Sequence, residues 1–245
     1  MQNYNLGFID NEVIYKYVKN TVSKYSTFID LDKFNKNIVD PIKLTFDAKV
    51  YGKTIQQVIE DECFRQIDKA NSNQLGYFHQ NLFGLIGNGW TIPQKGFDIV
   101  NDKRKIFVEM KNKHNTMNAS DQRDIYLIML DKVSKDPSAI CMLVEVISKQ
   151  SQYGRWEGTF KGQRLSHDRI LKLSIDKFYE VVFDDRIAFA KLCKALPTIL
   201  DDVIAETGQG HITNTVQKEL GVYSKDLFKS LYLLAFKTYE GFKNF

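Results

Sequence analysis

Residues 96–118 read GFDIVNDKRKIFVEMKNKHNTMN, and this stretch contains two short runs of strand-forming residues around a polar turn. The runs 97–100 (FDIV) and 105–111 (KIFVEMK) are rich in β-branched and aromatic residues, which favour strands. Residues 101–104 (NDKR) have the composition of a turn. The stretch therefore predicts a β-hairpin.

The segments around the hairpin predict an α/β fold. Residues 139–147 (AICMLVEVI) are nearly all apolar, which predicts a strand buried on both faces, and 169–174 is a further strand candidate. Residues 148–168 form a long polar stretch, and a loop of this length in a compact domain is usually functional. We expect one domain over residues 1–245, with helical N- and C-terminal extensions. Apolar residues at helical spacing predict helices over 12–29, 54–70, 74–86 (after a turn at 71–73), 119–134, most of 175–205 and 222–242, with breaks at Pro197, Gly208 and Gly210.

The composition is that of a globular protein. Of 245 residues, 43% are hydrophobic, which suffices for a core. No apolar run approaches the roughly 20 residues that span a bilayer, and the first residues do not have the pattern of a signal peptide. The 3 cysteines are widely spaced and form no CxxC pair, which disfavours a disulfide framework and a zinc ribbon. We expect a cytoplasmic protein.

The net charge of +4 conceals a local concentration of basic residues. Segments 101–115 and 149–172 together hold eleven Lys and Arg against four Asp and Glu, whereas the rest of the chain holds 23 against 26. A phosphate-binding surface needs such a local surplus. Chance clustering on solvated faces is the alternative.

Three polar residues of the hairpin are candidates for catalysis. Glu109 and Lys111 alternate on the second strand, so they share a face, and the antiparallel first strand can bring Asp98 beside them. The two carboxylates, with the Met110 carbonyl between them, suit a hard cation such as Mg²⁺. A bound cation polarises a phosphate and lowers the pKa of its water, and an ammonium group stabilises the developing charge. The set predicts phosphodiester hydrolysis; an ordinary ion pair on an exposed sheet face is the alternative.

The same residues resemble a known motif. Residues 96–98 (GFD) followed by 108–111 (VEMK) resemble the PD-(D/E)xK nuclease motif, with Gly96-Phe97 where the motif has its proline. The run 111–118 (KNKHNTMN) resembles type II restriction endonucleases of the group that cuts GGNCC and GGWCC sites. Residues 64–69 (FRQIDK) and 76–81 (GYFHQN) are similar to that group too, and the resemblance extends from residue 54 onward.

This resemblance implies a central mixed β-sheet flanked by helices, the restriction-endonuclease-like core. It also implies Mg²⁺-dependent cleavage of double-stranded DNA by a homodimer. Asp98 and Glu109 match the metal-binding acids of the motif, and Lys111 matches its catalytic lysine. A two-fold dimer agrees with a palindromic site, whose two halves need equivalent readers. The GGNCC-like site rests on the resemblance alone.

Two segments hold the candidate DNA contacts. Polar residues after the catalytic strand suit phosphate contacts at the entry to a helix, with helix capping by Asn118 or Ser120 as the alternative. The stretch 149–168 is the candidate for reading bases, because Arg donates two hydrogen bonds to guanine; unspecific phosphate contacts are the alternative. The first segment offers Lys113, His114, Asn115, Thr116 and Asn118; the second offers Arg155, Lys161, Gln163 and Arg164, together with Gln152, Tyr153 and Trp156.

Further residues could join the site. Related nucleases often supply one more acid from a helix before the hairpin, so Glu60 and Glu62 are candidates, although solvated helix acids are the stronger expectation. His79 is expected to be a core histidine rather than a base, and the apolar stripe 227–236 is expected in the core rather than at a dimer surface.

Two other functions stay open at this point. One is a structure-specific or repair nuclease on the same scaffold, which would cut branched DNA without base preference. The other is a non-catalytic DNA-binding protein, in which Asp98, Glu109 and Lys111 would be merely structural.

Overall fold

The computed structural model describes residues 3–160 and 162–242, and the chain divides into two compact units. Unit 1 comprises Met1–Val22 and Gly76–Glu206, and unit 2 comprises Ser23–Leu75 and Thr207–Phe245. The single domain over 1–245 stays a prediction. Lys161, a candidate for reading bases, lies outside the described residues. In the described part of the chain, no helix is long and apolar enough to cross a membrane.

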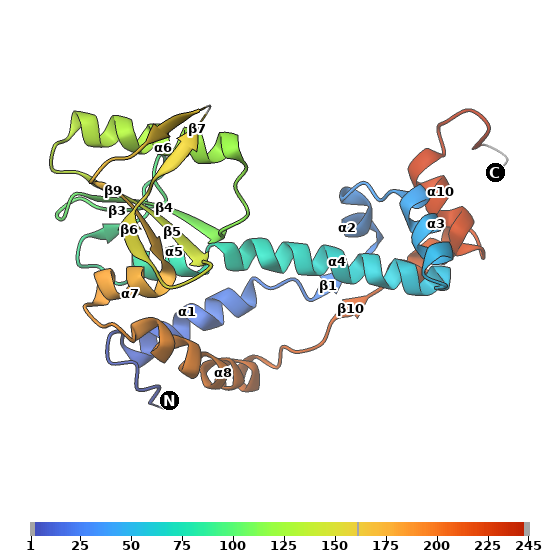
Figure 1. Ribbon diagram of the computed structural model, residues 1–245. Coiled ribbons are helices and arrows are strands. Elements are labelled where there is room, and N and C mark those ends of the chain that lie inside the picture. Colours follow the sequence, from blue (N-terminus) through green and yellow to red (C-terminus); the bar gives the residue numbers. More distant parts are fainter. Residues whose placement is uncertain (1–2, 161, 243–245) are drawn as a thin grey trace. The chain divides into compact units, whose positions relative to one another are not determined.

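A six-stranded mixed sheet forms the centre of unit 1, with the strand order β2-β3-β4-β5-β9-β6 (Figure 1). β3 and β4 are antiparallel, β4, β5 and β9 are parallel, and the edge strand β6 is antiparallel to β9. This confirms the hairpin and the mixed sheet. The strands are β2 (Trp90–Thr91), β3 (Ile99–Asn101), β4 (Ile106–Lys113), β5 (Ile140–Ile147), β6 (Tyr153–Arg155) and β9 (Ile170–Ser174).

Helices cover both faces of this sheet (Figure 1). Because side chains alternate along a strand, β4 directs Phe107 toward α6 (Ala119–Lys135), whereas Val108 belongs to the core shared with the helices of the other face. β5 is buried on both faces over 141–145, as its apolar run predicts. The helices of the other face are α1 (Asn11–Ser23), α5 (Phe78–Leu85), α7 (Ile175–Phe183) and α8 (Ala188–Thr207).

Three predicted boundaries were wrong. Residues 71–73 were predicted as a turn but continue the helix α4 (Ile55–Gly76). The Asn71 side chain accepts a hydrogen bond from the Ser26 amide and donates one to the Ser26 carbonyl, and these bonds favour the helical conformation instead of a turn. Pro197 lies inside α8 and does not end it. The first helix ends at Ser23, and residues 28–29 form a short strand instead.

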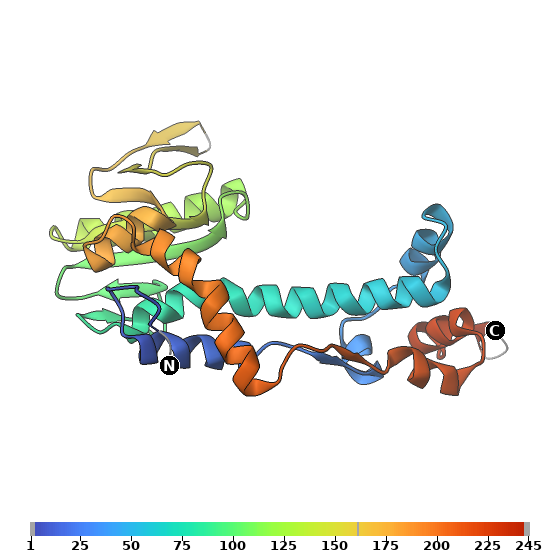
Figure 2. The ribbon, with the colours of Figure 1, turned by 90° about the horizontal axis from the view of Figure 1, so that it is seen from below.

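The stretch 148–168 is ordered by pairing rather than being a long loop. It contains β6, which extends the central sheet, and the hairpin of β7 (Gly158–Phe160) and β8 (Gln163–Leu165), which is coloured yellow in Figure 2. Trp156 is buried and contacts Tyr126 of α6 edge to face, with 5.2 Å between the ring centroids. The base-reading role considered for Trp156 is therefore wrong, because the ring belongs to the core.

Unit 2 is helical and draws on two separate parts of the chain. Ile59 and Cys63 of α4 share a core with Val216, Leu220 and Leu231, and Leu227 and Leu234 pack against it, so this side of the C-terminal apolar stripe faces the core. The parallel pair β1–β10 joins the two parts. The elements are β1 (Phe28–Ile29), α2 (Leu31–Lys36), α3 (Pro41–Val50), α4, β10 (Thr213–Asn214), α9 (Val216–Tyr223) and α10 (Leu227–Phe236).

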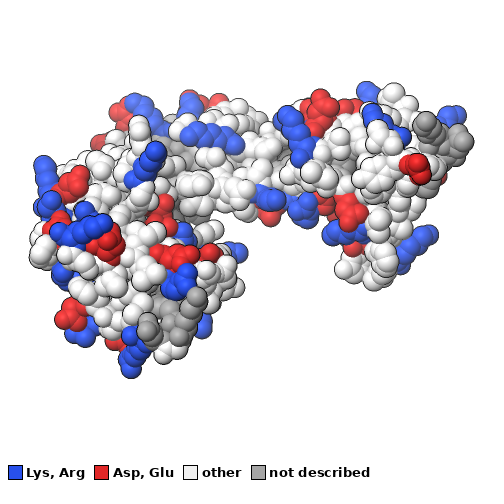
Figure 3. Space-filling view, turned by 90° about the horizontal axis from the view of Figure 1, so that it is seen from above, with Lys and Arg blue, Asp and Glu red and all other residues white. Residues whose placement is uncertain are grey.

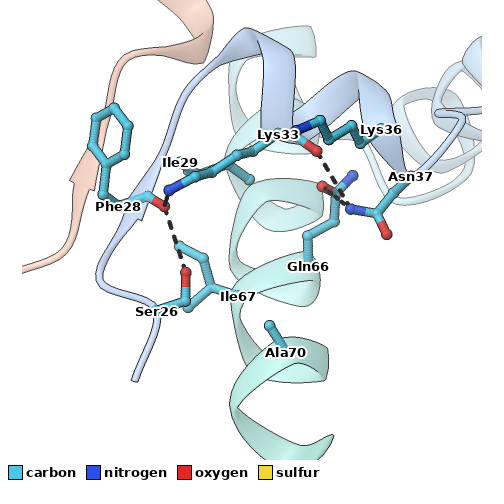
Figure 4. Close-up of a pocket in the computed structure, with 9 residues that line it drawn as sticks. All are labelled: Ser26, Phe28, Ile29, Lys33, Lys36, Asn37, Gln66, Ile67 and Ala70. Carbon is cyan, nitrogen blue, oxygen red and sulfur yellow. Dashed lines mark hydrogen bonds between the residues drawn. The ribbon is translucent and has the colours of Figure 1, made fainter. Parts of the chain in front are cut away.

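A pocket of about 230 Å³ opens between β1, α2 and α4 of this unit (Figure 4). The Asn37 amide donates to Gln66 Oε1 at 2.9 Å on its wall, and Lys33 and Lys36 lie at its edge. The residues that line it include no carboxylate and no thiol, so the pocket has no ligand set for a catalytic metal.

Candidate active site

The sheet brings Asp98, Glu109 and Lys111 together in unit 1, as the hairpin predicts. Ile99 pairs with Val108, so Asp98 lies at the next register position, beside Glu109. Glu109 and Lys111 follow Phe107 on the face that α6 covers. Asp98 directly precedes β3, and Glu109 and Lys111 lie in the second half of β4.

Asp98 is held by one hydrogen bond from a backbone amide and one from the Gln80 side chain. Its Oδ2 accepts a hydrogen bond from the Met110 amide at 2.8 Å, and its carbonyl accepts one from Gln80 of α5 at 3.1 Å. The N–H and C=O of one strand residue point to the same neighbouring strand. The Met110 carbonyl therefore faces the side on which Asp98 lies, as a shared metal ligand would have to.

Glu109 and Lys111 form an ion pair in a half-buried environment. The Lys111 ammonium lies 2.7 Å from Glu109 Oε1, and the two side chains are 28% and 19% exposed. Burial raises the pKa of Glu109; the hydrogen bond from Lys111 opposes this, and the negative charge of Asp98 adds to it. A cation bound between the two carboxylates would offset both the burial of the Glu109 charge and its repulsion from Asp98.

The two carboxylates have the donor capacity for a divalent metal. Within the part of the chain that the structure describes, no hydrogen bond reaches Asp98 Oδ1 or Glu109 Oε2, and no third Asp, Glu, His or Cys joins the pair. Mg²⁺ commonly binds through one or two carboxylates and fills its other positions with water and substrate phosphate. The residues present fit such an ion.

The residues after β4 form the predicted connection into a helix. The His114 amide donates to the Ile147 carbonyl at 3.0 Å, which ties the ends of β4 and β5 together. Thr116 Oγ1 donates to the Lys113 carbonyl at 2.7 Å and closes a turn. Asn118 caps α6 in a reciprocal box with Asp121, so the capping alternative is realised.

The outward face of this connection is available to a ligand. Lys113, Asn115 and Asn118 are exposed, and the amides at the N-terminus of α6 follow directly. This segment starts two residues after Lys111 on the same strand, so a phosphate bound there lies close to the catalytic candidates.

Arg155 and Arg164 of the second DNA-binding candidate segment are exposed and paired with acids. Arg155 lies 3.1 Å from Asp168 and Arg164 lies 2.5 Å from Glu157. Exposed ion pairs of this kind contribute little to the free energy of unfolding. Either arginine can therefore leave its acid and contact DNA at little cost in free energy. Gln163 lies in β8, opposite Phe160.

Some basic residues of 101–115 and 149–172 lie away from Asp98, Glu109 and Lys111 or bind backbone carbonyls. Lys105 precedes Glu109 by four positions, which places the β3–β4 turn roughly 13 Å back along the strand. Arg104 donates to the Val181 carbonyl, and Arg169 donates to carbonyls at the end of α6, so both serve structural roles. On the visible face of unit 1, blue and red side chains are intermixed (Figure 3). Part of the basic surplus in 101–115 and 149–172 therefore has structural roles.

The other candidate residues have partners of their own. Glu62 accepts hydrogen bonds from Arg65 and Gln66 within unit 2; burial raises its pKa, but these bonds outweigh burial and the pKa is lowered. Glu60 is exposed. His79 Nδ1 lies 2.9 Å from the Tyr179 hydroxyl among aromatic rings, and burial lowers its pKa to about 4, as expected for a core histidine.

The sequence reasoning missed one charged pair on the sheet face that carries Glu109 and Lys111. Glu145 of β5 is only 1% exposed, and its Oε1 lies 2.8 Å from the Lys172 ammonium of β9. The apolar run 139–147 concealed this glutamate. Its position next to Lys111 becomes visible only through the β4–β5 register.

A mixed sheet between two helical layers, with Asp and Glu-x-Lys on adjacent strands, is the arrangement of a restriction-endonuclease-like nuclease. The chain belongs to the Eco47II restriction endonuclease family, whose model matches residues 6–205. That span includes all three catalytic candidates and both DNA-binding candidate segments. Membership of a restriction endonuclease family implies a divalent metal cofactor and action on DNA.

Two curated relatives support the assignment. The chain is 33% identical to the type II restriction enzyme Sau96I of Staphylococcus aureus over 217 aligned residues, covering 83% of this chain and 83% of the relative. It is 26% identical to the type II restriction enzyme Eco47II of Escherichia coli over 246 aligned residues, covering 94% of this chain and 98% of the relative. The expected resemblance to this group is therefore confirmed, and the chain is a site-specific deoxyribonuclease by family.

Proposed function

We propose that the protein hydrolyses phosphodiester bonds of double-stranded DNA in a Mg²⁺-dependent reaction, at a short interrupted palindrome similar to GGNCC, as a homodimer. The observation that supports this proposal most directly is the pair of carboxylates Asp98 and Glu109 beside the Lys111 ammonium, each with one oxygen that no described residue binds. Membership of the Eco47II restriction endonuclease family supports site-specific cutting.

Each residue of the site has a distinct role in this proposal. Asp98 and Glu109, with the Met110 carbonyl, would hold the Mg²⁺ ion, which supplies polarisation of the phosphate and a more acidic bound water. Lys111 would position the attacking water and stabilise negative charge on the phosphate. The Asp98–Met110 hydrogen bond keeps the first carboxylate in place before the metal binds.

DNA would be held by the two candidate segments. Lys113, His114, Asn115, Thr116 and Asn118 at the end of β4 would contact the backbone next to the cut, while Arg155, Lys161, Gln163 and Arg164 would read the bases. The half-sites of a palindrome are related by a two-fold axis, so two chains would supply two readers and two cutting centres.

The test is cleavage of phage DNA by the purified protein with Mg²⁺ and with EDTA. The proposal expects discrete fragments that vanish on chelation, with ends that map to one interrupted palindrome, and a solution mass of two chains. A smear of fragments, or cutting confined to junctions, contradicts site-specific cutting. Binding without cleavage in both Mg²⁺ and Mn²⁺ contradicts the enzyme itself.

Substitutions of Glu109 and Lys111 test their proposed catalytic roles. Glu109→Gln and Lys111→Ala should each lower the cleavage rate by about 1,000-fold or more, because each removes a group of one catalytic unit, while DNA binding in Ca²⁺ persists through phosphate contacts. Glu180→Gln and Lys135→Ala are matched controls on α7 and α6 and should cut normally. Cleavage by either site variant at the wild-type rate would show that the catalytic assignment is wrong.

A further inference from the structure

Glu145 is a buried charged residue on the catalytic face of the sheet. A carboxylate with 1% exposure is rare in proteins unless it is paired and hydrogen-bonded. Alternation along the strands places Glu145 on the α6 face, with Leu143 of β5 and with Glu109 and Lys111 of β4.

Two segments hold this carboxylate. Ser148 Oγ donates to Oε2 at 3.2 Å, and Gln152 Nε2 lies 3.5 Å from the same oxygen while donating to Ser148 Oγ at 2.7 Å. Lys172 forms an ion pair with Oε1 at 2.8 Å. Ser148 and Gln152 precede β6, so the carboxylate fixes the beginning of the segment that holds Arg155 and Arg164.

One oxygen of Glu145 still lacks a hydrogen-bond donor. The Lys172 ammonium approaches Oε1 without hydrogen-bond geometry, and among the described residues no other donor is directed at this buried atom. In the β4–β5 register, Lys111 is the direct partner of Glu145. Neighbouring strands are about 4.8 Å apart, so the catalytic ammonium and this oxygen start from adjacent backbone positions.

Stability alone is a weak reason for such a pair. Replacing a buried ion pair by apolar residues of similar volume is often neutral or stabilising. The surrounding face is already apolar, with Leu143 and Cys141 fully buried on the same strand. The charge pair therefore calls for a role beyond stability.

We infer that Glu145 is a positioning residue, which holds the Lys111 ammonium in its working position and fixes the start of the base-reading segment with the same carboxylate. The inference rests on the proposed function. Among the described residues, Oε1 lies 2.8 Å from the Lys172 ammonium and has no hydrogen-bond donor, whereas Oε2 accepts from Ser148 and Gln152. Correct seating of the segment on DNA and correct placement of the catalytic ammonium thus depend on one buried group.

The test compares single-turnover cleavage and DNA binding of the full chain. Glu145→Gln keeps the shape and the hydrogen bond from Ser148 but removes the charge. The double variant Glu145→Gln/Lys172→Met removes the whole ion pair and avoids an unpaired buried charge. Glu180→Gln/Lys177→Met is the matched control, because it removes a pair at 2.9 Å on α7, which covers the opposite face.

The inference expects a specific split between rate and affinity. Both Glu145 variants should lower the single-turnover rate by about 10- to 100-fold, the scale of a misplacement near 1 Å. The Kd for cognate DNA in Ca²⁺ should change less than about threefold, because the glutamine still accepts the hydrogen bond from Ser148 that fixes the start of the segment. Glu145→Asp, which keeps the charge, should recover part of the rate. The control should match the wild type in both measurements.

Three results decide the matter. A double variant that folds, by circular dichroism, and cleaves within twofold of the wild-type rate overturns the inference. A rate loss fully accounted for by the unfolded fraction also overturns it, since that is a structural role. If the unchanged protein cuts no DNA with any divalent metal, the proposed function fails first, and the inference fails with it.

Discussion

Replacement of Trp156 by alanine tests how the segment 148–168 is attached to unit 1. The indole is 4% exposed, and its ring contacts Tyr126 of α6 at 5.2 Å between centroids. Leu165, at the end of the β7–β8 hairpin, packs against the same core. Trp156 is thus the anchor between the segment and α6.

The expected loss of stability is large. A buried indole removes about 150–250 Å² from water, worth about 4–6 kcal/mol at about 25 cal/mol per Å², and an edge-to-face pair adds about 1 kcal/mol. Alanine recovers a small part of this, and measured Trp→Ala costs in cores are about 3–5 kcal/mol. We expect a loss of about 4 kcal/mol, or about 8–16 °C in Tm for a unit of this size.

The assay is thermal and urea unfolding followed by circular dichroism, with DNA binding in Ca²⁺ measured alongside. Trp156→Phe keeps a ring beside Tyr126 and should lose only about 1–2 kcal/mol, with normal DNA affinity. Tyr153→Ala is the control in the same segment, since Tyr153 is 55% exposed and its loss should change stability by about 0.5 kcal/mol or less. If both Trp156 variants keep the wild-type midpoint but bind DNA weakly, the indole reads DNA and the burial argument is wrong.

Three further predictions concern the helix cap, a buried histidine and two arginines. Asn118→Ala should cost about 1 kcal/mol in urea unfolding because it removes the α6 cap, whereas Asn118→Asp should retain most of that stability; equal midpoints for all three proteins would contradict the capping role. Burial lowers the pKa of His79 from 6.5 to about 4. The neutral imidazole therefore contributes its full share of the free energy of unfolding above pH 6.5, and this contribution is lost as the pH falls toward 4. Unfolding at pH 7 and pH 4 should show a loss of up to about 3 kcal/mol from this group, and His79→Gln should show a smaller loss; an equal loss would exclude His79 as its source. Arg155→Ala and Arg164→Ala should leave stability within about 0.5 kcal/mol but weaken cognate DNA binding by about 1–3 kcal/mol in gel-shift assays at fixed salt, and unchanged affinity would rule out base contacts.

The hairpin that carries Asp98, Glu109 and Lys111 could be predicted because its information is local. Period-two alternation in 105–111 fixes the face that Glu109 and Lys111 share, and a tight turn fixes the partner strand that brings Asp98. The buried strand 139–147 was equally clear from its continuous apolar composition. These features depend on residues within one hairpin or one strand, so no knowledge of distant parts was needed.

The features that were missed depend on residues far apart in the sequence. Glu145 was hidden in an apolar run, and its role depends on Lys172 and on the register with Lys111. Residues 71–73 have turn composition, but hydrogen bonds to Ser26, 45 residues away, keep Asn71 in a helix. The strand β6 could not be predicted from its three exposed residues, because its conformation comes from pairing with β9.

The two-part origin of unit 2 has a consequence for synthesis on the ribosome. Its core joins Ile59 and Cys63 to Val216 and Leu220, which are translated only after nearly all of unit 1. At about 5–20 residues per second, this interval lasts roughly 7–30 s. The first part of unit 2 waits that long with the part of its apolar face that contacts Val216, Leu220 and Leu231 uncovered. A nascent chain stalled before residue 216 should therefore be a preferred client for a chaperone that binds exposed apolar helices.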